Sequence, residues 1–386
     1  IGRLRDFSFM HLTTLAVCSR LPHFVLCSAQ PPKVHFKDPL VRMVRIFGCM
    51  QAISQKPKLL ILELWGLGDL AIASRFIAAA SEKYEVTVLS KPYANDLQQA
   101  LWTKARVISF IAPWTAFRGK YRLLKWPWKQ LLQLAHQLRK EKFDLAVSGR
   151  WDPRDHAWMR VCGVKKCIGF PRSGSKHLLH HPLPLPHEKA HRYDQWKLVG
   201  EALDIKIPDW KYQSVEPNPA RCIKTAIIHT GAAQPVRVWP LDRYHQLIKA
   251  IEEQNINIQL ICDADQASWW KKNNRHPMVP QSVSALIEHL KTGDIFIGND
   301  SGPGHLAAAL DLPTLTIFGP QLTEWFRPAH PQGMVVEGKD CKYKPCFDNC
   351  RFETPHCMTG VTLEGVKGMM QTFLKQFTTA QNERDK

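Results

Sequence analysis

The stretch Asp294-Ile-Phe-Ile-Gly-Asn-Asp-Ser-Gly-Pro-Gly-His-Leu-Ala-Ala-Ala-Leu310 decides how the sequence is interpreted. Its first residues, Asp294–Ile297, are apolar enough for a buried strand. They run directly into a polar turn that contains glycine, and a helix is predicted over Gly304–Leu310. Ligands of open α/β sheets bind at the carboxyl ends of strands, where such turns lie. The stretch therefore predicts a ligand site between a parallel strand and a helix.

The backbone of this turn is suited to an anion. The N–H groups of Ser301, Gly302 and Gly304 precede the positive end of the predicted helix, and glycine lets a phosphate approach the backbone closely. An ordinary strand–helix turn, with Asp300 or Ser301 as the helix cap, is the alternative interpretation.

The same strand–turn–helix order recurs throughout the chain and predicts doubly wound α/β units. In the first half, strands are expected at Lys58–Leu64 and Tyr84–Ser90, with the turn Trp65–Asp69 and a helix over Leu70–Ser81 between them. In the second half the expected elements are strands at Thr225–His229, Ile256–Cys262 and Thr314–Phe318, and helices at Leu241–Gln254 and Ser284–Lys291.

The predicted organisation is two α/β domains behind an N-terminal extension. Residues 1–56 show no clear periodicity, and we expect this extension to be poorly ordered or not native. The first domain is predicted over 57–206 and the second over 221–386, joined by the Pro-rich linker 207–220. We find neither a convincing signal peptide nor an apolar window long enough to span a membrane, and we expect a reducing, cytoplasmic location.

Charge is distributed unevenly along the 386 residues. Residues 1–200 hold 32 Lys and Arg against 13 Asp and Glu, whereas residues 201–386 hold 20 against 21. A basic first half favours an anionic partner. The candidates are nucleic acid, an anionic membrane surface and a phosphorylated substrate. A solvated basic surface without a partner is the alternative.

Three further segments together with the opening stretch resemble one known family. Gly298–Ala309, followed by Leu312-Pro-Thr-Leu-Thr-Ile-Phe-Gly-Pro320, closely resembles the signature of glycosyltransferase family 9, the ADP-heptose:lipopolysaccharide heptosyltransferases. His229-Thr-Gly-Ala232 with Arg237-Val-Trp-Pro240 is similar to a second family segment, and Leu67-Gly-Asp69 to its amino-terminal Gly-Asp turn. The resemblance covers most of residues 58–370.

This resemblance implies a GT-B fold, in which two Rossmann-like domains face each other across a cleft. It implies an inverting transfer of heptose from ADP-heptose to the inner core of lipopolysaccharide, with Asp69 as the general base and with no required cofactor. A helix cap is the alternative role for Asp69. The implied donor-binding residues are Thr230, Gly231, Arg237, Asp265, Asp300, Ser301, Gly302 and His305.

Two details of the donor region stand apart. Arg237 occupies a position where the family usually has Lys, which changes the geometry of the donated hydrogen bonds. Asp263-Ala-Asp265 resembles the metal-binding Asp-x-Asp of other glycosyltransferases, and we favour recognition of the ribose or base by Asp263 or Asp265 over a metal.

The basic first domain is the expected acceptor side, with a phosphorylated lipopolysaccharide core as partner. Trp114–Trp128 combines aromatic and basic residues and suits an acceptor loop, a membrane-surface contact or a surface helix with its tryptophans in the core. The expected location is peripheral, at the inner face of the cytoplasmic membrane of a Gram-negative bacterium. The candidate acceptor residues are Arg118, Lys120, Arg122, Arg150, Arg154, Arg172 and Lys176.

A cysteine cluster near the carboxyl terminus has three open interpretations. Cys341, Cys346, Cys350 and Cys357 lie close together in the sequence and are candidates for a zinc site, a disulfide or buried thiols.

Competing functions also remain open at this point. They are a GT-B enzyme that uses another sugar nucleotide, a nucleotide-sugar epimerase, and a non-catalytic protein that binds glycolipid or nucleic acid. No nucleic-acid motif supports the last of these, so nucleic acid is not expected as a partner.

Overall fold

The structure is a computed structural model that describes residues 56–116, 120–210 and 222–378. The predicted extension 1–56, apart from Lys56, lies outside the described residues. Arg118 and most of the predicted linker 207–220 also lie outside them.

The first half of the described chain forms a sheet of six parallel strands in the order β3-β2-β1-β4-β5-β6. This is the strand order of a Rossmann fold, so the expected doubly wound topology is confirmed here. Its elements are β1 (Lys58–Leu62), α2 (Leu67–Lys83), β2 (Glu85–Ser90), α3 (Ala94–Leu101), β3 (Arg106–Ser109), η1 (Pro113–Thr115), η2 (Leu123–Lys125), α4 (Trp128–Glu141), β4 (Leu145–Ser148), α5 (Pro153–Val161), β5 (Lys166–Gly169), η3 (Ser175–Leu178), β6 (His181–Pro182) and α6 (Arg192–Ala202).

The second half forms a sheet of five parallel strands in the order β11-β10-β9-β7-β8. In chain order this is the flavodoxin-like variant of the same doubly wound fold. Its elements are β7 (Thr225–His229), η4 (Pro235–Arg237), α7 (Leu241–Glu252), β8 (Asn257–Ile261), η5 (Ala264–Gln266), α8 (Ala267–Lys272), α9 (Val283–Leu290), β9 (Ile295–Asn299), α10 (Gly302–Ala309), β10 (Thr314–Phe318), α11 (Thr323–Phe326), β11 (Met334–Glu337), α12 (His356–Thr359) and α13 (Leu363–Thr378).

The central strands explain why each sheet forms. All five residues of β9 are buried and four of the five in β1 are, as expected for parallel strands covered by helices on both faces. Each sheet reverses its strand order at one point, between β1 and β4 in the first sheet and between β7 and β9 in the second. Open α/β sheets bind ligands in the crevice at such switch points.

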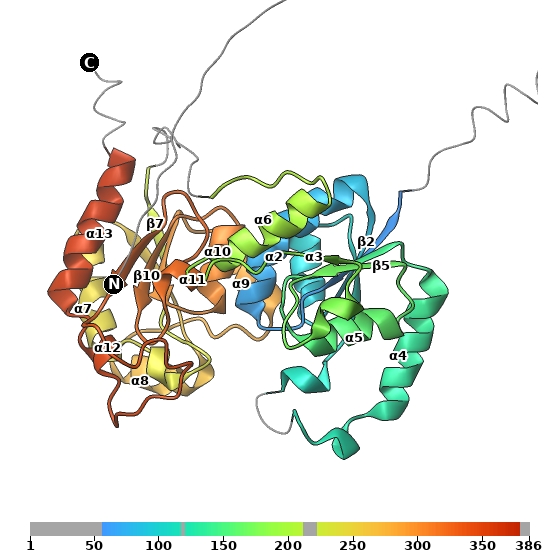
Figure 1. The fold of residues 1–386 in the computed structure, drawn as a ribbon. Helices are drawn as coiled ribbons and strands as arrows, with labels where there is room; N and C mark the ends of the chain where they lie inside the picture. Colours follow the sequence, from blue (N-terminus) through green and yellow to red (C-terminus); the bar gives the residue numbers. More distant parts are fainter. Residues whose placement is uncertain (1–55, 117–119, 211–221, 379–386) are drawn as a thin grey trace, which may run out of the picture. The chain divides into compact units, whose positions relative to one another are not determined.

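Helices α2 and α10 contribute to one hydrophobic cluster that spans the two halves. Leu70, Phe76 and Ile77 of α2 belong to the same buried cluster as Leu306 of α10 and Phe296 of β9. Figure 1 shows α2 and α10 side by side between the two sheets. Their N-termini therefore point into one region of the molecule.

Two predicted elements differ from the structure. Helix α2 begins at Leu67, so the expected turn Trp65–Asp69 already contains the first helical turn. In the described part of Trp114–Trp128 the structure has the end of η1 and the short helix η2 in place of a regular surface helix, and Pro127 separates η2 from α4. Among the described helices, none is both long and apolar enough to cross a membrane.

Candidate functional site

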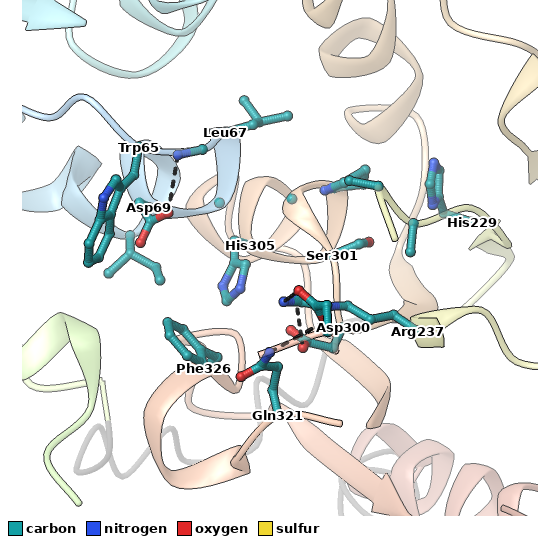
Figure 2. Close-up of a pocket in the computed structure, with 18 of the residues that line it drawn as sticks. Trp65, Leu67, Asp69, His229, Arg237, Asp300, Ser301, His305, Gln321 and Phe326 are labelled. Atoms are coloured by element: carbon teal, nitrogen blue, oxygen red, sulfur yellow. Dashed lines mark hydrogen bonds and ion pairs between the residues drawn. The ribbon is translucent and has the colours of Figure 1, made fainter. Parts of the chain in front are cut away.

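A cavity of about 530 Å³ opens where the two switch points meet (Figure 2). Residues 65–69 and Ile72 line it from the first half. The second half contributes the residues that follow β7 and β9 together with loop residues near 321–348. The cavity thus lies at the carboxyl ends of both central strands, where the sequence places the Gly-Asp and Asp-Ser-Gly turns.

Asp69 stands at the first-half wall of this cavity. Its Oδ2 accepts the Gly66 N–H at 3.2 Å, so Asp69 closes a capping box as the third residue of α2 and is not the N-cap itself. Its Oδ1 lies 3.5 Å from Nε of Arg192, and about a fifth of the side chain is exposed. The carboxylate is therefore fixed on one side and open to the cavity on the other.

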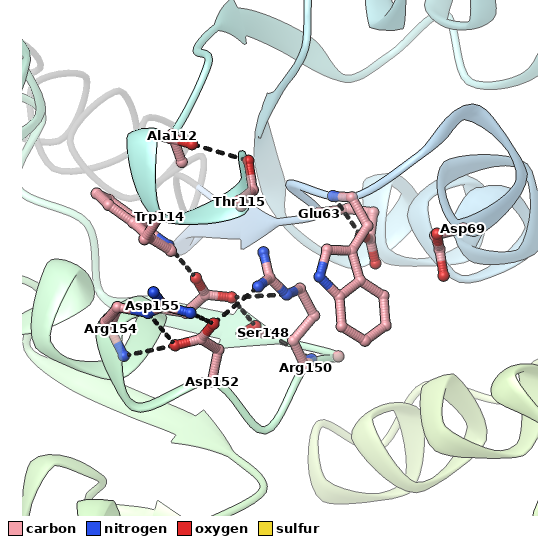
Figure 3. A network of polar contacts seen from close by, with 12 residues as sticks. Glu63, Asp69, Ala112, Trp114, Thr115, Ser148, Arg150, Asp152, Arg154 and Asp155 are labelled. Atoms are coloured by element: carbon pink, nitrogen blue, oxygen red, sulfur yellow. Dashed lines mark hydrogen bonds and ion pairs between the residues drawn. The ribbon is translucent and has the colours of Figure 1, made fainter. Parts of the chain in front are cut away.

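A buried charge cluster lies beside Asp69, and Figure 3 shows two of its members, Glu63 and Arg150, together with Asp69. Arg192 and Arg150 lie over the ring of Trp65, with their guanidinium carbons 4.1 and 4.7 Å from its centroid. Glu63 accepts the Trp65 N–H at 3.2 Å and is almost completely buried. Burial and the neighbouring Asp69 raise the pKa of Glu63 to about 7, against the opposing effect of the two arginines.

The sequence interpretation missed Glu63, Trp65 and Arg192. Glu63 and Trp65 lie immediately before the Gly-Asp turn, and a charged residue at the end of a buried strand was the available signal for Glu63. Arg192 begins α6, more than a hundred residues after Asp69, so only the folded chain brings the two together.

The second-half wall is formed by the start of α10. Ser301 is the N-cap, and Pro303 in the first turn has no N–H. The Gly304 N–H donates to the Ser301 carbonyl at 3.1 Å, which corrects the expectation that it faces an anion. The Ser301 and Gly302 amides remain as the candidate donors at this helix end.

His305 projects from α10 into the cavity (Figure 2). It is buried, and its Nδ1 has no hydrogen-bond partner among the described residues. Burial lowers the pKa of His305 to about 4, so the ring is neutral at neutral pH.

Arg237 and Asp300 face each other across a short ion pair. Arg237 donates to both carboxylate oxygens of Asp348 at 2.7 and 2.8 Å, and its Nη1 lies 3.1 Å from Asp300. Burial raises the pKa of Asp300 to about 6, although Arg237 acts in the opposite direction. The planar fork of an arginine suits this arrangement of two carboxylates, and the same fork suits a diphosphate. Asp348 was not singled out from the sequence.

The loop after β7 contributes differently from what the sequence predicts. The Thr230 hydroxyl donates to Gln266 at 2.7 Å and is buried, so Thr230 does not line the cavity. Gly231 is also absent from the lining, but a Cβ there would lie 2.2 Å from Asp263. Asp263, and not Asp265, lines the cavity, together with the buried His229. Gly231 is therefore needed to let Asp263 reach the site.

The side chain of Asn299 connects the segments that form the second-half wall of the cavity. Its side-chain oxygen accepts the Trp239 N–H at 3.0 Å and the Tyr244 hydroxyl at 2.9 Å. Its amide donates to the carbonyl oxygens of Thr230 and Gly231 at 2.8 and 3.3 Å. One buried amide thus connects the ends of β7 and β9.

Two more cavities share Trp65 with the first. One, of about 430 Å³, has five aromatic residues in its wall together with Arg172 and Arg192. The other, of about 650 Å³, is lined in part by Lys120, Arg150, Arg154 and Arg172, so four of the candidate acceptor residues lie together. Arg122 and Lys176 are exposed and do not line it.

The four carboxy-terminal cysteines surround one small cavity of about 20 Å³. All four are free thiols. In the part of the chain that the structure describes, no three His, Cys, Asp or Glu side chains are arranged to hold a metal ion. Cys357 is buried and the other three are partly exposed, and the role of the cluster stays a prediction.

Comparisons with known proteins place these features in a family. The model of glycosyltransferase family 9 (heptosyltransferase) matches residues 131–356, which is more than half of the chain. Lipopolysaccharide heptosyltransferase 1 of Pseudomonas aeruginosa is 23% identical over 283 residues, which cover 64% of this chain and 77% of that protein. Lipopolysaccharide heptosyltransferase 3 of Escherichia coli is 29% identical over 148 residues, which cover 35% of this chain and 38% of that protein. Lipopolysaccharide heptosyltransferase 1 of Campylobacter coli is 30% identical over 108 residues, and the chain spans only 32% of that protein's length.

Solved structures show the same fold at low sequence identity. ADP-heptose lipopolysaccharide heptosyltransferase II of Escherichia coli superposes with a TM-score of 0.60 at 16% identity, covering 83% of this chain and 99% of that one. A glycosyltransferase family 9 protein of Veillonella parvula gives a TM-score of 0.66 at 15% identity, covering 83% and 98%. The expected GT-B fold of two Rossmann-like halves is confirmed. Through its family match, its fold and the position of its cavity, this chain belongs to glycosyltransferase family 9, the heptosyltransferase family.

Proposed function

We propose that this protein transfers heptose from ADP-heptose to the inner core of lipopolysaccharide, with inversion at the anomeric carbon. The observation that carries the proposal is that the N-termini of α2 and α10 open on one cavity. One end presents a carboxylate, Asp69, and the other presents backbone amides beside Arg237. Such a cavity offers a base on one side and anion-binding groups on the other.

The donor half of the cavity suits a nucleoside diphosphate. Departure of the diphosphate develops negative charge, which the amides of Ser301 and Gly302 and the Arg237 guanidinium can stabilise. His305 is neutral and offers a hydrogen bond to the sugar or the diphosphate. A heptosyltransferase of Escherichia coli with the same fold has been solved with ADP-2-deoxy-2-fluoro heptose, which supports this choice of donor.

The acceptor half of the cavity performs the proton transfer. Asp69 takes the proton of an acceptor hydroxyl, the hydroxyl oxygen attacks the anomeric carbon, and the bond to the diphosphate breaks. The cavity lined by Lys120, Arg150, Arg154 and Arg172 also has Trp65 in its wall, and its cations suit a phosphorylated acceptor. We place this reaction at the inner face of the cytoplasmic membrane of a Gram-negative bacterium, and we expect no cofactor requirement.

Replacing Asp69 with Asn tests the proposal. Asn retains an acceptor for the Gly66 N–H, so the helix start is preserved, but it cannot take a proton. We expect turnover with ADP-heptose and a truncated lipopolysaccharide acceptor to fall by about a thousandfold or more, with the product weighed by mass spectrometry. Asp242→Asn, in the first turn of α7 and exposed, is the matched control.

The outcomes separate the alternatives. Near-normal turnover of the Asp69→Asn variant would assign Asp69 a capping role only. Transfer from another sugar nucleotide, or conversion of a sugar nucleotide without any acceptor, would replace ADP-heptose transfer with one of the competing GT-B activities.

A further inference from the structure

The surface formed by η2 and the start of α4 is unusually rich in exposed apolar side chains. Tyr121, Leu123, Leu124, Trp128 and Leu132 are between 49% and 99% exposed, and Leu124 is almost fully so. These five are half of the large hydrophobic residues that are exposed in the described chain. Monomeric proteins rarely leave a contiguous apolar patch of this kind without a partner. We call these five side chains, with the basic residues among them, the η2–α4 surface.

The charge of this segment has one sign. Lys120, Arg122, Lys125 and Lys129 alternate with the apolar residues, and no acidic residue occurs between Asp96 and Glu141. Arg122, Lys125 and Lys129 are exposed. A surface that mixes aromatic and aliphatic groups with cations is complementary to an anionic lipid bilayer, where Trp and Tyr occupy the interface and Lys and Arg meet the headgroups.

The exposed residues are held on a rigid base. Trp114 is buried and donates to Asp155 at 2.8 Å, and its ring lies 5.7 Å from that of Trp126. Trp126 in turn lies 5.5 Å from Trp128, whose Nε1 donates to the Leu123 carbonyl at 2.9 Å. These contacts between tryptophans connect the η2–α4 surface to the core and fix its backbone, so the apolar side chains cannot easily turn inward.

The position of the surface agrees with a membrane role. In Figure 1, α4 lies at the outer edge of the half that contains the first sheet. Lys120, Tyr121 and Leu123 also line the basic cavity that reaches Trp65. A lipid-linked acceptor held at a bilayer would therefore enter the cavity from this side, a consequence that rests on the proposed function.

We propose that the η2–α4 surface docks this protein on an anionic phospholipid bilayer. Exposed aliphatic side chains such as Leu124 and Leu132 favour a bilayer over nucleic acid. Proteins bind single strands through aromatic stacking and cations, and neither interaction uses an exposed leucine. The binding itself requires neither a donor nor an acceptor sugar.

Vesicle flotation tests this docking. The full-length protein is mixed with vesicles of phosphatidylcholine alone or with about a third phosphatidylglycerol, and the bound fraction is measured at low and high salt. We expect binding to the anionic vesicles, weakening at high salt because the charges are screened. Leu124→Glu and the double variant Lys125→Gln/Lys129→Gln should each lower the partition coefficient by about tenfold or more.

Matched variants control for charge and exposure elsewhere. Lys271→Gln/Lys272→Gln removes two exposed lysines of α8, and Val161→Glu places an acid at an exposed apolar position of α5. Both controls should bind vesicles as the unchanged protein does. Equal binding by Leu124→Glu and the unchanged protein, or binding to neither kind of vesicle, would overturn the proposal.

Two other outcomes would also overturn it and identify the true occupant. Dimerisation in gel filtration that Leu124→Glu abolishes would assign the surface to a second copy of this chain. Binding of labelled single-stranded RNA with no vesicle binding would assign it to nucleic acid. Transfer to a short acceptor without lipid separates this test from the proposed activity, because Leu124→Glu should leave that reaction unchanged whether or not docking occurs.

Discussion

Gly68 lies directly against the imidazole of His305. A Cβ at Gly68 would be 2.7 Å from Cδ2 of His305 and 3.5 Å from the Cα of Gly302. Real side chains do not approach so closely, so glycine at position 68 is what allows the starts of α2 and α10 to meet. This contact brings Asp69 to the same cavity as Ser301 and Arg237.

Gly68→Ala should therefore separate the two helix starts. We expect a loss of about 1–3 kcal/mol in the free energy of unfolding by urea, since His305 is buried and cannot move aside freely. Turnover should fall with it. The matched control is Gly368→Ala in α13, where a Cβ meets nothing within 4 Å. Alanine is favoured there by helix propensity, so a destabilised Gly368→Ala variant would contradict the reasoning.

Arg237 is expected to bind the diphosphate only in competition with Asp348 and Asp300. Arg237→Ala should weaken ADP binding by tenfold or more, as measured by calorimetry. Asp348→Asn removes one competing carboxylate and should tighten ADP binding several-fold. The exposed Asp340→Asn should change nothing. Weaker ADP binding in Asp348→Asn would show that Asp348 orients Arg237 and does not compete with the ligand.

Asn299→Ala should destabilise the protein by about 2–4 kcal/mol, because it leaves the buried Trp239 N–H and the buried Tyr244 hydroxyl without their acceptor. Urea unfolding measures the loss. Asn95→Ala, at an exposed position of α3, should change stability by less than about 0.5 kcal/mol. Similar values for the two variants would exclude a structural role for Asn299.

Glu63 should make stability depend on pH. Its pKa in the fold is about 7, above the ordinary 4.5, so the folded state binds the proton more tightly than the unfolded state. The stabilising effect of protonation is complete below pH 4.5 and is lost as the pH rises to about 7. The full shift corresponds to about 3 kcal/mol.

Glu63→Gln removes this titration. The gain in melting temperature of the variant over the unchanged protein should therefore be larger at pH 8 than at pH 5. Glu201→Gln, on the exposed face of α6, should give the same difference at both pH values. A constant difference for Glu63→Gln would mean that its carboxyl group titrates normally.

Trp65 borders the three larger cavities, and its loss should affect binding of the acceptor more than binding of the donor. Trp65→Ala removes the ring on which Arg150 and Arg192 lie, so each arginine loses its cation–π contact and keeps only its polar partners. We expect the KM for the acceptor to rise by tenfold or more while the Kd for ADP stays within about threefold. An equal rise in the KM for the acceptor and the Kd for ADP would mean that Trp65 stabilises the whole cavity and does not act on the acceptor in particular.

The elements that local pattern determines were predicted well. The strand Thr314–Phe318 coincides with β10, and the predicted helix from Leu241 begins at the first residue of α7. The pattern of a buried parallel strand or an amphipathic helix lies within a short run of consecutive residues, so these elements can be predicted without knowledge of the rest of the fold. The start of α2 was misplaced because Asp69 caps from the third helical position, and a capping box looks like a turn in the sequence.

The sequence by itself determined the family, the doubly wound α/β pattern and the placing of Asp69, Asp300 and Ser301 after strand ends. These depend on short runs of residues whose chemistry is local. Only the tertiary structure decided three contacts of the site. Arg192 lies beside Asp69, and Arg237 donates to Asp348. The Asp263 carboxylate lies against Gly231, where a Cβ would not fit. Each of these contacts joins residues far apart in the chain, so no local pattern records it and only the folded chain brings the partners together. The starts of α2 and α10 likewise meet at Gly68 and Gly302 only in the fold.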